Sequence, residues 1–133
     1  MEHHFEREDG WPTFTKKGWS AAEYDAAAGS ADITVDQLDR LLALVDATKA
    51  KGLHVTAITR DEFYDPELAE VFVEWVRAFK DGPGLLVLRG FPVRDRPLED
   101  IWRMYWGIGA HFGIGVSQDT HGKLMGTVAV QPG

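Results

Sequence analysis

The chain has 133 residues, of which 44% are hydrophobic, and its 14 basic and 21 acidic side chains give a net charge of −7. This length and composition are typical of one globular domain with a hydrophobic core, and they exclude a disordered chain. The acidic balance argues against binding to a phosphate backbone, so no nucleic-acid partner is expected. The lack of cysteine excludes disulfides and thiolate metal sites.

Targeting signals are not evident in the sequence. The N-terminal residues are too polar for a signal peptide. No uninterrupted apolar run approaches the roughly 20 residues that a membrane span requires. We therefore expect a soluble, cytoplasmic protein with no membrane partner.

The organisation along the chain begins with residues 1–18, which show no hydrophobic period and are expected to form a loose lead-in. Residues 19–133 are expected to form one domain or part of one. Three capping boxes, each a Ser or Thr with Glu or Gln three residues later, predict helix starts at Ser20, Thr34 and Thr59.

The second capping box opens the clearest helix. Its apolar residues recur at the spacing of one helical face: Leu38, Leu41, Leu42 and Val45. Gly52, which follows two lysines, predicts its end. Another helix is predicted from Asp65-Pro66 to Gly82, because proline suits the first helical position. Its expected apolar face consists of Leu68, Val71, Phe72, Trp75 and Phe79.

The remaining third of the chain predicts a buried strand at Leu85–Leu88, a helix that starts near Pro97 and ends at Gly113, and a final strand at Leu124–Val130. The expected apolar face of this helix consists of Leu98, Ile101, Trp102, Tyr105, Gly109 and Phe112. The predicted fold is therefore of the α+β class.

The five histidines are the first place to look for a metal site: His3, His4, His54, His111 and His121. A mononuclear iron oxygenase needs two histidines and one carboxylate. The only His-x-acid step is His4-Phe5-Glu6, which lies at a polar terminus and reads as solvated chain. His111, in the last predicted helical turn, favours a capping role. No metal or catalytic site is predicted.

Glycines and aromatic residues near the third helix have structural interpretations. Gly107, Gly109 and Gly113 do not match the spacing of a dinucleotide fingerprint, and they favour close helix packing with Gly113 as the cap. Five aromatic residues at helical spacing are expected to belong to the core rather than to a ligand cage: Trp75, Phe79, Trp102, Tyr105 and Trp106.

The polar loop 117–121 follows a predicted helix and precedes a predicted strand. Loops held by rigid elements often carry binding groups. Ser117 and Gln118 can donate and accept hydrogen bonds, and His121 adds a titratable group. We interpret these three residues as candidate substrate-binding groups, with an ordinary polar loop as the alternative.

Four segments in order resemble the N-terminal half of the TauD/TfdA-like (taurine dioxygenase-like) Fe(II)/2-oxoglutarate-dependent dioxygenases. They are Ile-Thr-Arg-Asp-Glu-Phe at 58–63, a Gly-Pro-Gly, hydrophobic, Arg-Gly-Phe-Pro stretch at 82–92, Tyr-Trp-Gly-x-Gly-x-His-x-Gly at 105–113, and Val-Ser-Gln-Asp with Gly-x-Leu-x-Gly-x-Val at 116–128. The resemblance covers most of the chain.

The resemblance implies a double-stranded β-helix, or jelly-roll, of which this chain would be an incomplete part. It implies Fe(II) and 2-oxoglutarate as cofactors of a complete enzyme that oxidises a small molecule. The family's His-x-Asp…His iron ligands are expected beyond Gly133, so this chain alone is expected to bind neither cofactor and to be inactive. In relatives the loop that matches 117–121 lies near the substrate pocket, which favours Gln118 as a substrate-side residue.

Two other hypotheses remain open. The chain could be a truncated, non-catalytic binding or subunit-interaction module. It could also be one half of a split enzyme whose C-terminal half or partner chain brings the iron ligands.

Overall fold

A computed structural model describes residues 20, 22, 25, 27, 29–126 and 128–130. The predicted lead-in at 1–18 and Glu23 of the first capping box lie outside the described residues. The elements, in order, are β1 (Ser30–Asp32), α1 (Val35–Ala50), the 3₁₀-helices η1 (Val55–Ala57) and η2 (Pro66–Leu68), α2 (Ala69–Asp81), β2 (Val87–Arg89) and α3 (Leu98–Gly109). This mixture of helices and strands agrees with the α+β class.

Helix α1 begins and ends as predicted. The Thr34 side chain accepts a hydrogen bond from the Gln37 N–H at 3.1 Å, and the Gln37 side chain accepts one from the Thr34 N–H at 3.0 Å. This reciprocal pair satisfies two backbone donors at the helix start. Gly52, just past the end, has φ +66°, a conformation that glycine adopts at little cost.

The predicted helix start at Thr59 is wrong. Its capping bond forms, with the Glu62 N–H 3.3 Å from Thr59 Oγ1, but only a single turn follows. The reason lies in Asp65, which precedes Pro66 and is held extended at φ −135°, because a residue before proline is disfavoured in the helical region. The helix predicted from Asp65-Pro66 is confirmed as η2 followed by α2.

The sheet is a parallel pair, β1 with β2, in the register Ser30↔Val87, Ala31↔Leu88 and Asp32↔Arg89. The predicted strand at Leu85–Leu88 is shifted to β2, and it is not buried, because Leu85 and Val87 are each about 40% exposed. Strand β1 was not predicted. The described residues of Leu124–Val130 form no strand, since no described segment pairs with them.

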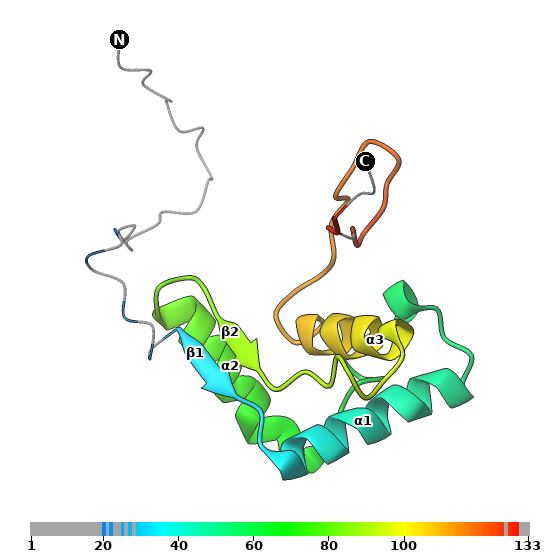
Figure 1. Cartoon of the computed structure of the whole chain (residues 1–133), viewed down its shortest axis with the longest axis horizontal. Helices are drawn as coiled ribbons and strands as arrows, with labels where there is room; N and C mark the ends of the chain where they lie inside the picture. The colour runs from blue at the N-terminus through cyan, green and yellow to red at the C-terminus, as the bar shows by residue number, and fades with distance from the viewer. Residues whose placement is uncertain are drawn as a thin grey trace.

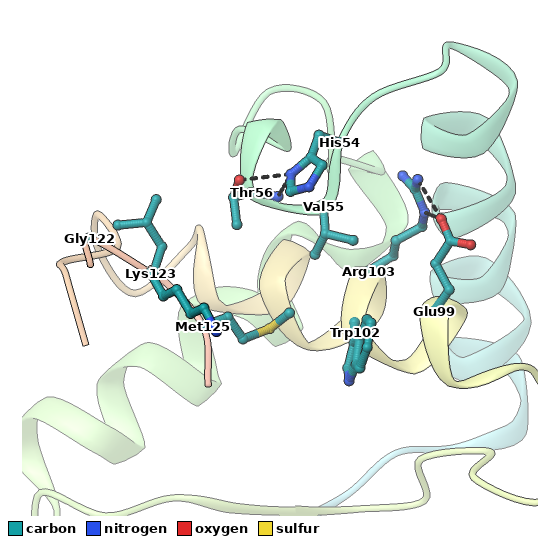
Figure 2. Close-up of a pocket in the computed structure, with 10 residues that line it drawn as sticks. His54, Val55, Thr56, Glu99, Trp102, Arg103, Gly122, Lys123 and Met125 are labelled. Carbon is teal, nitrogen blue, oxygen red and sulfur yellow. Dashed lines mark hydrogen bonds and ion pairs between the residues drawn. The ribbon is translucent and has the colours of Figure 1, made fainter. Parts of the chain in front are cut away.

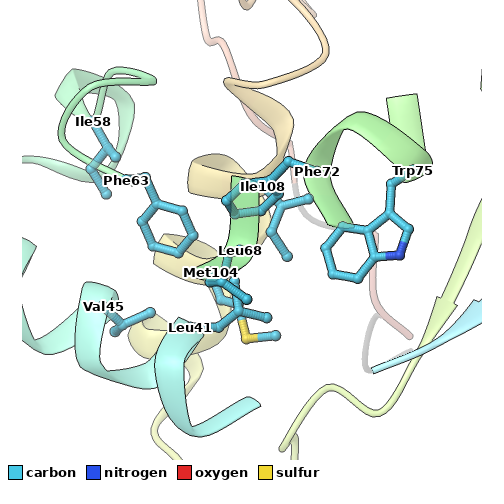
Figure 3. Close-up of a cluster of buried hydrophobic side chains, with 9 residues drawn as sticks. All are labelled: Leu41, Val45, Ile58, Phe63, Leu68, Phe72, Trp75, Met104 and Ile108. Carbon is cyan, nitrogen blue, oxygen red and sulfur yellow. The ribbon is translucent and has the colours of Figure 1, made fainter. Parts of the chain in front are cut away.

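The core lies where α1, α2 and α3 meet, together with the turns between α1 and α2 (Figure 3). Its buried residues are Leu41, Val45, Ile58, Phe63, Leu68, Phe72, Trp75, Met104 and Ile108. Figure 1 shows the two strands at one end of this body and α3 at the other, with the chain after α3 rising away from α1. No helix in the described ranges combines the length and the apolar character that crossing a membrane requires.

The predicted apolar face of α3 is wrong for most of its residues, although Ile101 is half-buried and Phe112 packs against the core. Leu98 and Tyr105 are 58% and 62% exposed, and Trp102 is 36% exposed. The buried residues are instead Asp100, Arg103, Met104, Gly107 and Ile108. Of the aromatic residues expected in the core, Trp75 is buried and Trp106 is half-buried, whereas Phe79, Trp102 and Tyr105 are exposed.

The predicted close packing at the glycines of α3 is confirmed at one position and wrong at another. A Cβ on Gly107 would lie 2.4 Å from the ring of Phe63, so close packing is confirmed there. A Cβ on Gly109 would have no neighbour within 4 Å, so close packing is wrong at that position. The helix ends at Gly109 rather than at Gly113, and Gly113 does not have the positive φ of a glycine cap.

Candidate functional site

A cavity of about 510 Å³ opens between η1, α3 and the segment Gly122–Met125. Its lining comes from three separate parts of the chain: His54, Val55, Thr56, Glu99, Trp102, Arg103, Gly122, Lys123, Leu124 and Met125. Figure 2 shows Lys123 and Met125 on one side and His54, Val55 and Trp102 on the other, with the Arg103 guanidinium turned toward Glu99.

The η1 wall is positioned by a histidine cap. His54 Nδ1 accepts a hydrogen bond from the Thr56 N–H at 3.2 Å and lies 2.9 Å from Thr56 Oγ1. Because Nδ1 is the acceptor, Nε2 carries the proton of the neutral ring. Both side chains are therefore held by the start of the 3₁₀-helix, which also buries Val55.

The α3 wall contains a buried guanidinium. The Arg103 side chain is only 8% exposed. Its Nε and Nη2 donate to Glu99 Oε1 at 3.2 and 2.9 Å, and its Nη1 donates to Thr48 Oγ1 at 3.3 Å. An arginine has five N–H donors, so these three bonds leave two without an acceptor among the described residues. The group is thus fixed in place but retains donor capacity.

The third wall is a closed turn. The Gln118 N–H donates to the Lys123 C=O at 2.6 Å, and the Asp119 side chain accepts from the N–H groups of His121 and Lys123 at 2.8 and 3.1 Å. Gly122 has φ +79°, which suits glycine at this tight position. The turn sets Lys123 at the cavity, and no described carboxylate forms an ion pair with its ammonium group.

The chain that leads into this turn is anchored to the helical body at Gly115. A Cβ on Gly115 would lie 2.5 Å from the indole of Trp106, so glycine permits the backbone to rest on the ring. The same indole donates its N–H to the Ile58 C=O at 3.1 Å. The ring is therefore held in place on one side and supports the segment on the other.

The predicted substrate-binding residues Ser117, Gln118 and His121 lie in the exposed turn and do not line the cavity. Ser117 Oγ donates to the Asp119 C=O at 2.8 Å, and Gln118 Nε2 donates to the Val116 C=O at 3.0 Å. These side chains build the turn that carries Lys123. Their predicted contact with a substrate stays a prediction.

The sequence analysis did not identify the cavity residues as a site. One pattern in the sequence could have indicated part of it. Glu99 and Arg103 lie four residues apart on a predicted helix, which is the spacing of a helical ion pair. Nothing in the sequence links either of them to His54 or to Lys123, because the three segments are far apart along the chain.

A buried carboxylate fixes the α3 wall against α1. Asp100 is 1% exposed, and its side chain lies 2.9 Å from Lys49 Nζ and 3.1 Å from Arg96 Nη1. Arg96 also pairs with Asp46 of α1 at 2.9 Å. The hydrogen bond from Lys49, and then that from Arg96, lower the pKa of Asp100 in spite of its burial.

His111 has a structural contact rather than a place in the cavity. Its Nε2 donates to the Phe63 C=O at 2.7 Å, and its ring stacks on Phe72 with centroids 3.9 Å apart. Burial lowers its pKa, the bond to Phe63 opposes that shift, and the charge of Arg60 adds to it. The predicted capping role is wrong in detail, because the ring bonds to Phe63 and not to the last carbonyls of α3.

The described residues do not offer a metal site. No group of three or more His, Asp or Glu side chains in this part of the chain could hold a metal ion. The His4-Phe5-Glu6 step lies outside the described residues. The residues at hand therefore do not fit the iron that the sequence resemblance implies.

Comparison with known proteins assigns no family. Neither a family model nor a curated protein matches this chain. The resemblance to the TauD/TfdA-like dioxygenases accordingly rests on the four sequence segments alone.

Proposed function

We propose that this chain is the N-terminal portion of an Fe(II)/2-oxoglutarate-dependent dioxygenase of the TauD/TfdA-like family, which oxidises a small molecule. In this proposal the chain supplies flanking helices, early strands of a jelly-roll fold and one wall of the substrate pocket. Support comes first from the order of the four segments at 58–63, 82–92, 105–113 and 116–128.

The structural observation that supports an incomplete chain is the pair β1–β2, although its parallel direction is not itself a feature of a jelly-roll, whose strands are antiparallel. Each strand has only three residues, and the two are parallel. Parallel strands occur almost only in larger sheets whose faces are covered, and a lone two-stranded pair is marginal in water. No other described segment pairs with either strand. The pair therefore has the character of a piece of a larger sheet.

Exposed apolar side chains support the same proposal. Leu98 and Tyr105 on α3, together with Val73 on α2, are each more than half exposed. Large exposed apolar surfaces mark places where other protein packs. In this proposal a C-terminal half or a partner chain would cover these side chains and complete the sheet.

Iron enters this proposal only through residues outside the described chain. Since the described residues do not fit a metal, the ligands are assigned to the C-terminal half or to a partner chain, and 2-oxoglutarate with them. The part of this chain would be to hold the pocket wall and exclude water around the reacting groups. Ser117, Gln118 and His121 would face the substrate.

The test begins with the coding sequence downstream of codon 133 and in adjacent reading frames. The proposal expects a His-x-Asp/Glu step, a distal histidine and an arginine. The joined protein should then bind Fe(II) and 2-oxoglutarate without oxygen, giving the visible charge-transfer band of the chelate, and should form succinate when oxygen is admitted. The matched control is the joined protein with the His-x-Asp/Glu histidine replaced by alanine.

Failure has a clear form. If neither frame encodes such residues, or if the joined protein gives no chelate band, the dioxygenase proposal is wrong for this chain.

The binding-module alternative is favoured by one observation, the closed core of nine buried apolar residues. A self-sufficient module would unfold cooperatively as a monomer or a defined oligomer, whereas an orphaned half would aggregate or unfold without cooperativity. Calorimetry together with light scattering on the 133-residue chain separates the two.

A further inference from the structure

We propose that α3 forms the contact of a weak twofold dimer, in which the exposed stripe of α3 in one copy packs antiparallel against the same stripe in a second copy of this chain. The proposed function leaves open which protein covers these side chains, and this inference names a second copy. It is carried by described residues of α3 alone and does not depend on the dioxygenase assignment.

The stripe consists of Leu98, Trp102, Tyr105 and Gly109. Because successive residues of an α-helix are about 100° apart, these four positions lie within an arc of about 60° on one side of α3. Leu98, Trp102 and Tyr105 are 58%, 36% and 62% exposed. A Cβ on Gly109 would meet nothing within 4 Å. Three positions of the stripe are therefore exposed and apolar, and the fourth leaves an open space.

The spacing of the stripe makes it complementary to itself. The intervals between its residues are four, three and four, which is the alternation found where two helices pack along a common seam, and they read the same in both directions. A second α3 that runs antiparallel, about a twofold axis between Trp102 and Tyr105, therefore presents its stripe at matching heights. Leu98 of each copy then faces Gly109 of the other, and Trp102 faces Tyr105.

Both facing pairs suit close packing between the helices. The open space at Gly109 accepts the leucine side chain of the second copy. The indole and phenol rings form an aromatic pair, which stabilises a contact beyond the area that it buries. A parallel second copy would instead set glycine against glycine and leave a gap at that end of the stripe. The antiparallel arrangement is the one that fills the surface.

Charge also favours the antiparallel direction. Glu99 borders the stripe, and its side chain is 56% exposed. In the antiparallel pair, the two copies of Glu99 lie nine residues apart along the helix axis. That is about 14 Å at the rise of an α-helix, beyond the screening length of about 8 Å at physiological salt. A parallel pair would bring the two carboxylates side by side, which opposes that alternative.

The area of the stripe sets the expected strength of the dimer. Its three exposed side chains offer on the order of 350 Å² per copy, if each whole side chain has about 200–250 Å². Two copies together then bury less than the roughly 1,200–2,000 Å² of a standard interface. We therefore expect a reversible dimer with a dissociation constant of roughly 10 µM to 1 mM.

Sedimentation equilibrium of the 133-residue chain, from about 20 µM to about 1 mM, measures this association. The parent should follow a monomer–dimer equilibrium. The dimer should be weaker at low salt, because each copy carries a net charge of −7 and the repulsion is then less screened. The ¹⁵N-labelled chain should show concentration-dependent shifts at the backbone amides of α3.

Gly109→Leu is the sharpest variant, because it separates this packing from non-specific hydrophobic association. The added leucine occupies the space that Leu98 of the second copy needs, so the dissociation constant should rise about tenfold or more, although the surface becomes more apolar. Leu98→Ala alone should raise it about three- to tenfold.

The double variant Leu98→Ala/Gly109→Leu sets a large side chain against a small one again. Its dissociation constant should return to within about threefold of that of the parent, because the two positions are coupled across the dimer. The matched control is Val35→Ala, which removes a side chain that is 79% exposed at the start of α1 and should associate like the parent.

The inference is overturned if the parent stays monomeric at about 1 mM, if it forms species larger than a dimer, if Gly109→Leu associates as tightly as the parent, or if the double variant does not recover. Should Gly109→Leu lose the circular dichroism spectrum of the parent, Leu98→Ala and Val35→Ala decide, and equal dissociation constants for these two overturn the inference. A failed dimer leaves the dioxygenase proposal standing, and a joined protein without a chelate band leaves the dimer standing.

Discussion

The two faces of α3 are not divided by polarity in the way that an amphipathic helix usually is. Its buried face includes Asp100, Arg103 and Gly107 beside Met104 and Ile108. Its exposed face includes Leu98, Trp102 and Tyr105. A helix that hides a carboxylate and a guanidinium while exposing an indole and a phenol is not arranged by side-chain hydrophobicity alone.

The difference teaches that partners on neighbouring elements decide which face of α3 is buried. Asp100 has Lys49 from α1, and Arg103 has Thr48 from the same helix. Buried charges are tolerated when they are paired and hydrogen-bonded. Gly107 removes a side chain where the ring of Phe63 needs space. On the opposite face, Leu98 and Tyr105 are more than half exposed, and the proposed function assigns these side chains to contact with missing protein.

The largest expected effect comes from substituting two adjacent residues of α3, one on the buried face and one on the exposed face. Met104 is fully buried and Tyr105 is 62% exposed. Met104→Ala should lower the free energy of unfolding by about 2–5 kcal/mol, since it loses apolar contacts and leaves a cavity. Tyr105→Ala should change it by no more than about 0.5 kcal/mol. Urea unfolding of both variants measures this, and equal losses would contradict the assignment of the two faces.

A second pair of substitutions uses the glycines. Gly107→Ala places a Cβ into the Phe63 ring and should cost about 1–3 kcal/mol through overpacking. Gly109→Ala meets open space, and alanine has the higher helix propensity, so that variant should be neutral or stabilised by up to about 1 kcal/mol. Thermal unfolding followed by circular dichroism tests both. If Gly109→Ala is destabilised and Gly107→Ala is unaffected, the assignment of close packing to Gly107 and open space to Gly109 is wrong.

Local signals in the sequence predicted the elements whose causes are local. The capping box at Thr34 and the glycine at 52 set the bounds of α1 because each acts within one helical turn. The pairing of β1 with β2 joins residues 30–32 to 87–89, and no short-range pattern records it. The exposed face of α3 was also predicted wrongly. Its apolar residues follow helical spacing, but contacts with distant parts of the chain decide which face is buried.

The candidate site was less predictable than the helices. The cavity collects residues near 54, 100 and 123, which only the tertiary fold brings together. Sequence reasoning selected Ser117, Gln118 and His121 because they are polar and lie between predicted elements. The structure uses the backbone and side chains of that loop to form a turn, and it is the neighbouring Lys123 that lines the cavity.

The third prediction concerns the buried charge of Asp100 and how the stability that it contributes depends on pH. Asp100→Asn keeps the shape of the side chain but removes its charge, and it should cost about 1–2 kcal/mol at pH 7. The pKa of Asp100 is lowered in the folded chain, so its stabilisation is complete above the unfolded value of about 4 and is lost as pH falls through the folded value. Parent and variant should therefore converge in acid.

The control for Asp100 is Asp46→Asn, which also removes a carboxylate from Arg96. Asp46 is 55% exposed, so its loss should cost less than about 0.5 kcal/mol. Urea unfolding between pH 2 and pH 7 compares the three proteins. A constant gap between the parent and Asp100→Asn across that range would show that the charge of Asp100 does not stabilise the fold.

The smallest expected effect lies just past α3, where His111 continues the buried face. His111→Gln should cost about 0.5–1.5 kcal/mol at pH 7.5, chiefly through the bond to Phe63. Burial lowers the pKa of His111, so the unfolded chain binds its proton more readily, and the parent should lose stability as pH falls from about 6.5 through the folded value.

His111→Gln lacks that titration, so its stability should fall less steeply than that of the parent over the same range. His121→Gln, at an exposed position in the turn, is the matched control and should follow the parent. Unfolding midpoints at pH 7.5 and pH 5.5 measure the difference. If the dependence of stability on pH is the same in His111→Gln as in the parent, protonation of His111 does not destabilise the folded chain, and the prediction is wrong.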